Sequence, residues 1–435
     1  MSSPAAGLTG DADGIRDSAA RLRQRHAADR RFRLYGLLAV LASMLALVAL
    51  LGGIAVKGFS AFYHHQLILE VSLDRDVLGL PASPSRKDLR AANYSAAIRE
   101  RLRELEPDVS SRSEKRALYA LVSSVAGFEL QRRVLDEPAL LGATLQVELP
   151  LSDEAGRYLK GDISRETEES RRKLKDRQLD WLDAWQAQGF VEASFNLPFF
   201  VAGDSREPEV AGLAGALLGS LWTLLVTLAL SFPLGVGAAV HLEEFAPRGR
   251  VTDFLEVNIN NLAAVPSIVY GLLGLAVFLN FMNLPRSAPL VGGLVLALMT
   301  LPTIIIAARA AIRAVPPSIR EAALGVGASP LQVVAHHVLP LALPGILTGT
   351  IIGMARALGV TAPLLMIGLV AFIADPPSGP LAPATALPVQ IYLWAESPER
   401  AFQELTFGAI LVLVGFLLLM NAIAIVLRNR SEQSW

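Results

Sequence analysis

The sequence of 435 residues contains no cysteine. This absence excludes disulfide bonds, thiol nucleophiles and thiolate metal sites, so any extracytoplasmic part must fold on its own hydrophobic core. Charged residues are also scarce, at 18% against 52% hydrophobic residues, and the mean hydropathy is +0.44. This balance excludes an ordinary soluble globular protein. A GxxxxGK[ST] run is missing as well, which excludes an ATP site of the P-loop type.

The charged residues are concentrated in one part of the chain. Between residues 57 and 209 lie 48 of the 79 charged residues, and only 17 lie between residues 210 and 427. A helix needs about 20 mostly apolar residues to cross a bilayer. Six stretches meet this requirement, namely residues 32–56, 210–242, 254–282, 288–312, 343–373 and 405–427. We therefore predict an all-α polytopic membrane protein with six transmembrane helices.

Positive charge predicts the orientation of these helices. Seven arginines lie before or at the start of the first apolar stretch, the last of them Arg33, and such a cluster resists translocation, so we expect residues 1–31 in the cytoplasm. The first stretch begins too late and is too long for a signal peptide, which indicates a retained anchor. Six crossings then place residues 57–209 outside and the tail, residues 429–435, in the cytoplasm. The predicted location is the cell inner membrane.

The hydrophilic insert, residues 57–209, has a mixed pattern. Helical spacing runs through residues 88–106, 113–136 and 154–188, and strand-like alternation through residues 67–73 and 143–151. In the last helical stretch Trp181 and Trp185 are four residues apart and share one face. The pattern predicts an α+β domain outside the membrane between the first and second helices, and it does not indicate what this domain does.

The loop between the fourth and fifth apolar stretches predicts two short helices at the membrane surface. A proline pair opens the first helix, and Gly325 and Gly327 supply a left-handed turn. Ser329 can cap the second helix, which we expect Pro340 and Pro344 to end.

This loop resembles the cytoplasmic signature of the permease subunits of bacterial ABC importers, which is EAA, three residues, Gly, nine residues, a hydrophobic residue, any residue and Leu-Pro. The matching residues are Glu321, Ala322, Ala323, Gly327, Leu339 and Pro340. His337 departs from the pattern, since an aliphatic residue is usual there. The resemblance implies that the coupling helices, residues 315–345, dock on an ATP-binding subunit. The alternative is an ordinary amphipathic surface helix.

Further stretches resemble the A-type permease of the phosphate-specific importer (PstA). They are residues 199–209 (FFVAGDSREPE), 242–247 (LEEFAP), 257–275 (VNINNLAAVPSIVYGLLGL), 284–293 (LPRSAPLVGG) and 359–365 (GVTAPLL). The resemblance covers roughly 230 residues, and the insert resembles the extra N-terminal region of proteobacterial members. It implies the type I importer permease fold for residues 210–428.

Arg356 is the candidate cation of a translocation path. An ionised residue at the centre of a membrane helix costs ~3 kcal/mol or more, so a functional reason is expected. The resemblance implicates this arginine in phosphate passage, and the hydroxyl of Thr361 can face the same cavity. Members of the family usually carry Glu at position 360, four residues later on the same helix face, where this chain has Val360. In the alternative interpretation Arg356 snorkels to the cytoplasmic interface.

Two other groups are weaker candidates for the path. Arg286 and Ser287 in a short outer loop could hydrogen-bond arriving phosphate, although an exposed arginine is more often only solvated. Asn261 closes a polar run before Pro266 that predicts a broken helix lining water, and its amide could equally join two helices. Glu243 and Glu244 are explained by solvation.

We thus predict a permease subunit of an ATP-driven phosphate importer, with no enzymatic activity, cofactor, metal or nucleic-acid partner of its own. The implied partners are a second permease subunit (PstC-like), two ATP-binding subunits (PstB-like), a periplasmic phosphate-binding protein (PstS-like), phosphate and the lipid bilayer. A sulfate or molybdate importer remains an alternative in the same class. A membrane sensor or scaffold whose outer domain binds a ligand is the alternative from another class.

Overall fold

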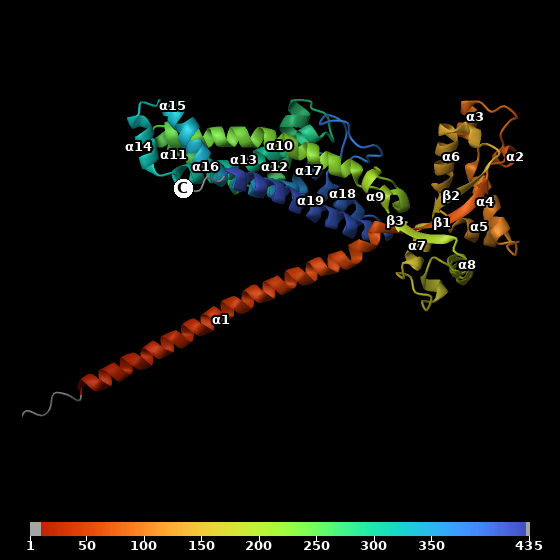
Figure 1. The fold of residues 1–435 in the computed structure, drawn as a ribbon, viewed down its shortest axis with the longest axis horizontal. Helices are drawn as coiled ribbons and strands as arrows, with labels where there is room; N and C mark the ends of the chain where they lie inside the picture. Colours follow the sequence, from red (N-terminus) through yellow and green to blue (C-terminus); the bar gives the residue numbers. More distant parts are fainter. Residues whose placement is uncertain (1–9, 432–435) are drawn as a thin grey trace, which may run out of the picture. The chain divides into compact units, whose positions relative to one another are not determined.

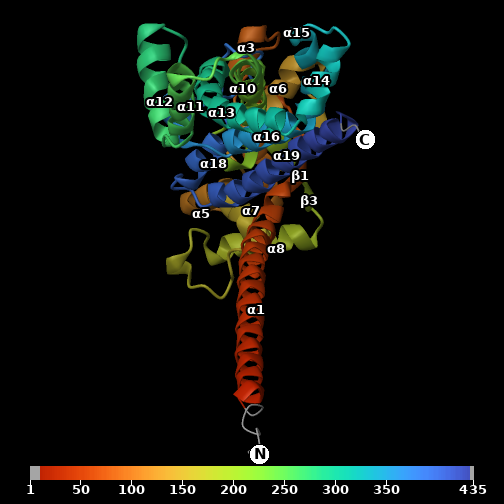
Figure 2. The same cartoon turned by 90° about the vertical axis from the view of Figure 1, so that its left-hand side faces the viewer.

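The computed structural model describes residues 10–431, so residues 1–9 and 432–435 of the two predicted cytoplasmic termini lie outside the described residues. The chain divides into two compact units, Met1–Val56 and Lys57–Trp435. The described residues of the first unit belong to one helix, α1 (Gly10–Phe59), which carries the first apolar stretch (Figure 1). The second unit contains the predicted insert and the remaining apolar helices (Figure 2).

The insert is built on a small antiparallel sheet with the strand order β2-β1-β3. The central strand is β1 (Tyr63–Ser72), flanked by β2 (Thr144–Pro150) and β3 (Val191–Phe195). Leu69 of β1 lies opposite Val147 of β2, and both side chains are buried. The two strands expected from alternating hydrophobicity are confirmed, and β3 is a third strand that the sequence pattern did not reveal.

Short helices surround this sheet. They are α2 (Arg75–Leu78), α3 (Arg86–Ala91), α4 (Tyr94–Leu105), α5 (Arg112–Tyr119), α6 (Ala126–Asp136), α7 (Asp153–Leu159) and α8 (Asp176–Ala187). The long helix predicted over residues 154–188 is wrong, because the chain turns at Gly161, whose φ of 86° suits glycine. Trp181 and Trp185 are buried together in the core of the insert, as their spacing predicted, and Trp185 donates its indole N–H to Glu106 at 2.9 Å.

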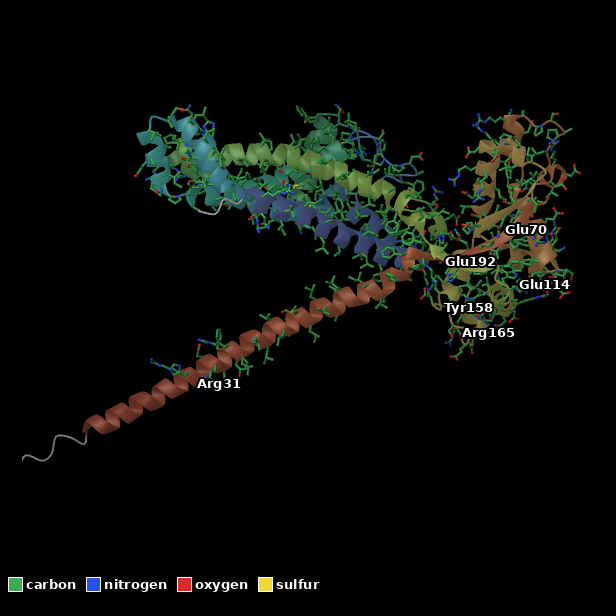
Figure 3. All side chains as sticks on the ribbon, viewed as in Figure 1. Arg31, Glu70, Glu114, Tyr158, Arg165 and Glu192 are labelled. Atoms are coloured by element: carbon green, nitrogen blue, oxygen red, sulfur yellow. The ribbon has the colours of Figure 1, made fainter. Side chains whose placement is uncertain are left out.

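The loop between α7 and α8 is tied back to both helices. The hydroxyl of Tyr158 in α7 donates to Asp183 in α8 at 2.9 Å. Arg165 in the loop, labelled with Tyr158 in Figure 3, pairs with Asp180 and Asp183 of α8. The segment that replaces the predicted long helix is therefore fixed by polar contacts, and it covers α8 rather than extending it.

The remaining chain is mostly helical, and the predicted fold class is confirmed. The main helices are α10 (Ala214–Val240), α11 (Arg250–Ala263), α12 (Ser267–Gly274), α13 (Pro289–Arg313), α16 (Leu339–Leu358) and α19 (Ala401–Ser431). Among residues 10–431, five helices are long and apolar enough to cross a membrane, and six if one bent pair counts as a span. This pair, Arg250–Ala263 and Ser267–Phe281, bends by 99° at Pro266, where the sequence predicted a broken helix.

Small residues bring the long helices into close contact. A Cβ atom added to Gly349 of α16 would lie 2.1 Å from Ala307 of α13, and one added to Gly345 would lie 2.7 Å from Ala311. Buried hydroxyl groups donate hydrogen bonds to backbone carbonyls of their own helix. Thr227 of α10, for example, donates to the carbonyl of Thr223, one turn earlier. Backbones can approach in this way only where side chains are small, which is how helices associate in lipid.

The fifth helix differs from its prediction at both ends. It starts at Pro330 with α15 (Pro330–Val333), passes through a π-helical turn (Val334–Val338) and continues as α16 to Leu358. Pro340 and Pro344 do not end it as predicted. Pro340 stands in the first turn of α16, where a missing N–H is tolerated, and Pro344 lies inside α16. After Leu358 the chain forms two short helices, α17 (Ala362–Met366) and α18 (Leu387–Ala395), before α19.

Candidate functional site

The first candidate feature is the helix-turn-helix that carries the EAA pattern. Its first helix is α14 (Pro317–Gly325), and Gly327 follows with φ of 91°, a left-handed conformation that favours glycine. Ser329 caps α15, since its hydroxyl accepts from the N–H of Gln332 at 3.4 Å and the Gln332 side chain accepts from Ser329 in return. The predicted cap and the predicted turn at Gly327 are confirmed. Gly325 is the last helical residue and does not have positive φ.

One face of this motif packs against the long helices and the other is open. Ala323 is buried with Ile312 of α13 and Val338 of the π-helical turn. Glu321 and Ala322 are exposed. Leu339 and Pro340 are half-buried inside the long fifth helix, so they do not belong to the same surface as Glu321.

We call the open part of the motif the coupling face. Beside Glu321 it carries three apolar side chains that are well exposed, Leu324 (50%), Val326 (85%) and Leu331 (68%). Exposed apolar side chains around one acid are typical of a surface that binds another protein. Of the small residues in the sequence signature, Ala323 packs inside the motif, and the exposed face is formed by the residues next to it.

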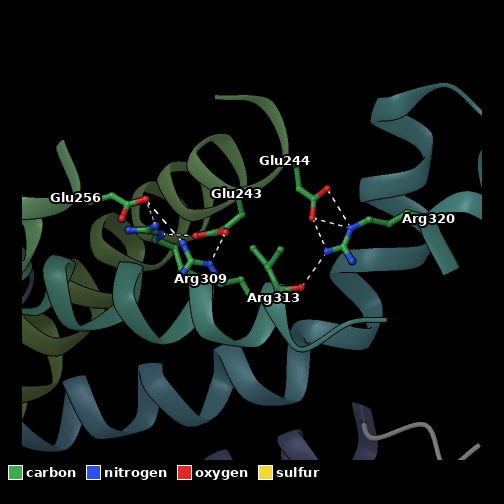
Figure 4. Close-up of polar contacts among 7 residues, drawn as sticks. Glu243, Glu244, Glu256, Arg309, Arg313 and Arg320 are labelled. Carbon is green, nitrogen blue, oxygen red and sulfur yellow. Dashed lines mark hydrogen bonds and ion pairs between the residues drawn. The ribbon is translucent and has the colours of Figure 1, made fainter. Parts of the chain in front are cut away.

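Arg320 anchors α14 to the end of α10. Its guanidinium donates to Glu244 through Nη2 at 2.7 Å and Nε at 3.1 Å (Figure 4). The same group donates to the carbonyls of Val315 at 2.7 Å and Ile312 at 3.0 Å. Glu244 lies in the π-helical turn that ends α10 (His241–Phe245). Because the planar guanidinium of Arg320 bonds both Glu244 and these carbonyls, it holds α14 in one orientation.

A second cluster of ion pairs lies next to this anchor (Figure 4). Arg309 of α13 donates to Glu243 at 2.5 Å and also pairs with Glu256 of α11. Arg313 donates to the other oxygen of Glu243 at 2.7 Å. Arg309 and Glu243 are each only 10% exposed at their side chains, so these charges depend on one another.

The prediction that solvation explains Glu243 and Glu244 is therefore wrong. Their arginine partners are 66 to 76 residues away in the sequence, and no local pattern links positions so far apart. One signal was available. Arg309 stands within an apolar stretch, where a charged residue needs a partner, and acids near the same end of a neighbouring helix are the natural candidates.

Arg356 lies in the last turn of α16, not in the middle of a helix. Its side chain is exposed, and it makes no hydrogen bond or ion pair with any residue in the described range 10–431. The helix ends at Leu358, so Val360 does not continue the face of Arg356, and the expectation of a shared helix face is wrong. Val360 is half-buried and packs with the apolar cluster around Leu358 and Leu364, and Thr361 precedes α17.

The other path candidates are not joined to Arg356. Asn261 near the end of α11 and Arg286 in the loop before α13 are both exposed, and within the described chain no hydrogen bond links either to Arg356. Ser287 has a structural role, because its hydroxyl donates to the carbonyl of Gly368 at 2.6 Å. The broken helix near Asn261 is closed by Tyr270, which donates to the carbonyl of Leu262 at 2.8 Å.

The insert contacts the start of α19 through a polar cluster. Lys160 donates to Glu404 of α19 at 2.6 Å and to the carbonyl of Ser60 at 3.0 Å. Burial and the nearby Lys160 lower the pKa of His64 to about 4, so this imidazole is neutral at pH 7. Burial raises the pKa of Glu209 to about 7 and that of Asp153 to about 6.

Both halves of the chain are similar to known proteins. Residues 231–434 match the family described as binding-protein-dependent transport system inner membrane component, and residues 19–169 match a domain of unknown function, DUF3333. A structure of the MetNI methionine ABC transporter in an inward-facing conformation aligns with 49% of this chain and 95% of its own, at 18% identity and a TM-score of 0.41.

Curated relatives give closer matches. The chain is 35% identical over 178 residues to a probable ABC transporter permease protein, YqgI of Bacillus subtilis, covering 41% of this chain and 59% of that protein. It is 32% identical over 226 residues to the phosphate transport system permease protein PstA 2 of Mycobacterium tuberculosis, covering 52% of this chain and 74% of that protein. It is 33% identical over 224 residues to PstA 1 of the same species, covering 51% and 72%. The chain therefore belongs to the binding-protein-dependent transport system inner membrane components, in the group of PstA-like permeases.

Proposed function

We propose that this chain is the PstA-type permease subunit of an ATP-driven phosphate importer. The proposal is that it forms half of a translocation path, receives phosphate from a periplasmic binding protein and is moved by two ATP-binding subunits. ATP hydrolysis then belongs to these partners. The observation that carries the proposal is the coupling face around Glu321, on a helix that Arg320 fixes to α10. The names of its relatives support phosphate as the substrate.

The proposed orientation places residues 57–209 in the periplasm and residues 315–345 in the cytoplasm, with both termini cytoplasmic. The arginines at the end of α13 and in α14 support it, because positive residues are retained inside. The absence of native cysteine allows a direct test. In intact spheroplasts a membrane-impermeant maleimide should label Ser83→Cys of the insert and leave Val326→Cys of the coupling face unlabelled until the membrane is opened. Labelling of Val326→Cys from outside would overturn the orientation.

The proposed path runs along the exposed side of Arg356. An unpaired arginine facing lipid would cost ~3 kcal/mol, whereas one facing a second permease subunit across a wet seam can meet the phosphate oxygens. The position of Arg356 at the end of α16 supports a water-filled path between the two subunits. Gly359 and the turn that follows place polar backbone groups of the chain near this arginine. Thr361, Asn261 and Arg286 are proposed to contribute polar groups at other points of this path.

The experiment that tests the proposal separates transport from assembly. Glu321→Gln and Gly327→Val should abolish most phosphate uptake while the complex with the ATP-binding subunits is still purified. The first variant removes the acid of the coupling face, and the second forces a side chain into a left-handed turn at a cost of about 1–2 kcal/mol. Asp253→Asn, an exposed acid at the start of α11, is the matched control. Normal uptake in both variants would overturn the importer role and favour a sensor or scaffold.

Substrate selectivity needs its own measurement. Uptake of labelled phosphate should be unaffected by excess sulfate or molybdate. Competition by either anion at comparable concentration would instead favour a general oxyanion importer.

A further inference from the structure

The insert contains a polar cavity that the transport function does not use. Its volume is about 460 Å³, and it lies between α7, the loop that follows it and the residues just before α19. Five cationic side chains line it, namely Arg157, Arg171, Arg172, Lys173 and Arg400. Three acids line it as well, Asp153, Glu154 and Asp162, so the lining carries a net positive charge. A concave site with excess positive charge attracts anions.

Arg172 is the central observation. Its side chain is only 4% exposed, although it is charged. One nitrogen, Nη2, donates to Asp176, while the buried Nε and Nη1 have no partner among the described residues. A buried guanidinium N–H without an acceptor is costly, and native proteins satisfy such groups with protein, water or a bound ligand. Arg172 is therefore a lining residue of this cavity whose positive charge is only partly compensated by Asp176.

The neighbouring cations are only loosely held. Arg157 lies 3.9 Å from Asp162 and Arg171 lies 3.7 Å from Glu168, separations too long for a hydrogen bond. Arg400 has no ion pair within residues 10–431, and only Lys173 has a close acid, Glu154. Most of the positive charge is therefore available to a ligand without breaking an existing short pair.

The lining also provides hydroxyl donors of the right kind. Ser164, Thr167 and Ser170 belong to the loop that Arg165 fixes against α8. Hydroxyls together with guanidinium groups are the donors that surround phosphate oxygens in proteins, because arginine matches the geometry of the oxyanion. We propose that this cavity binds the phosphate group of an anionic ligand.

Two sources can supply such a group. The cavity is several times larger than a phosphate ion, so it accommodates inorganic phosphate or the headgroup of an anionic phospholipid. Arg400 directly precedes α19, and the candidate membrane helix begins at Ala401. A headgroup at this membrane boundary could therefore reach the cavity as easily as a free ion.

The first arm of the test uses the full chain in nanodiscs of zwitterionic lipid and radiolabelled inorganic phosphate. Arg172→Gln and Arg400→Gln should each weaken binding by about tenfold or more, the loss typical of one charge-assisted contact. Arg132→Gln is the matched control, because this arginine is 70% exposed, pairs with Glu129 and lies outside the cavity. If Arg172→Gln fails to fold, the exposed Arg400 still provides the test.

The second arm uses native mass spectrometry of the same proteins in phosphatidylglycerol. If inorganic phosphate binds and both Arg172→Gln and Arg400→Gln weaken its binding, the ligand is the free ion. If phosphatidylglycerol is retained and both variants weaken its retention, the ligand is the lipid headgroup. Each result supports the proposal. Equal losses in Arg132→Gln, or binding of neither ligand, would overturn it. Arg356→Gln should leave binding in the insert intact, so failure of the transport proposal is recognised separately.

Discussion

Glu244→Gln is the most informative single change in this chain, because it removes the charge that fixes the coupling face. Glu244 accepts hydrogen bonds from two nitrogens of Arg320, Nη2 at 2.7 Å and Nε at 3.1 Å, and the side chains of Glu244 and Arg320 are 12% and 23% exposed. Charge-assisted hydrogen bonds contribute about 1.5–3 kcal/mol each, and Arg320 keeps its two backbone acceptors in the variant. We expect a net local loss of about 2 kcal/mol.

The assay is hydrogen exchange of the backbone amides of α14. A local loss of about 2 kcal/mol corresponds to roughly 30-fold faster exchange, because each 1.4 kcal/mol changes an equilibrium tenfold. The effect should be confined to α14 and the turn at Gly327. Phosphate uptake per ATP hydrolysed should fall in the same variant, since the surface that receives the motion is no longer held in place.

Two comparisons decide whether the reasoning holds. The double variant Glu244→Gln with Arg320→Gln should be little worse than Arg320→Gln alone, because Arg320→Gln already removes the contact with Glu244. Asp253→Asn neutralises a nearby exposed acid and should leave α14 unchanged. Unaltered exchange of α14 in Glu244→Gln, or equal acceleration in the control, would refute the anchoring role of Arg320.

Three further outcomes are expected. Gly349→Val should destabilise the purified chain by about 1–3 kcal/mol, because even a Cβ atom would lie 2.1 Å from Ala307. Gly237→Val is the control, because a Cβ atom there meets open space, and it should not destabilise the chain. Equal melting temperatures of the two variants would contradict this packing. The folded chain binds a proton at Glu209 more tightly than the unfolded chain does, since its pKa is raised from 4.5 to about 7. Through Glu209 the free energy of unfolding should therefore fall by up to about 3 kcal/mol between pH 4.5 and 7, and Glu209→Gln should remove this contribution in tryptophan-fluorescence melts, leaving the smaller one of Asp153. Val360→Glu should change phosphate uptake measurably, and unchanged uptake would exclude this position from transport.

Local signals in the sequence predicted local structure well. The turn at Gly327 and the cap at Ser329 depend on residues next to them, and both are found where expected. The end of the fifth helix could not be predicted in this way. The chain after Leu358 leaves the helix to pack α17 against α12, where Gly271 lies directly beside Pro363, and this contact joins residues about 90 positions apart. The hydrophobic run continues through the break, so periodicity alone extends the helix too far.

The same limit explains the candidate site. A match to a spaced signature located the segment around Glu321, but the signature does not contain the residues that fix it. Arg320 and Glu244 are paired only after α10, α13 and α14 come together. Charge in an apolar helix, as at Arg309, is the one sequence feature that indicates such a partner without saying which residue it is.

The unbroken helix from Pro330 to Leu358 has a mechanical consequence. Its 29 residues span about 43 Å at 1.5 Å per residue. The turn with the exposed Val326 precedes one end, and Arg356 stands in the last turn of the other end. For a run that moves as one rigid body, a tilt of about 10° about the first end displaces the guanidinium by roughly 7 Å. A small rotation imposed by a docked subunit would then arrive at the arginine as a movement larger than the width of a phosphate ion.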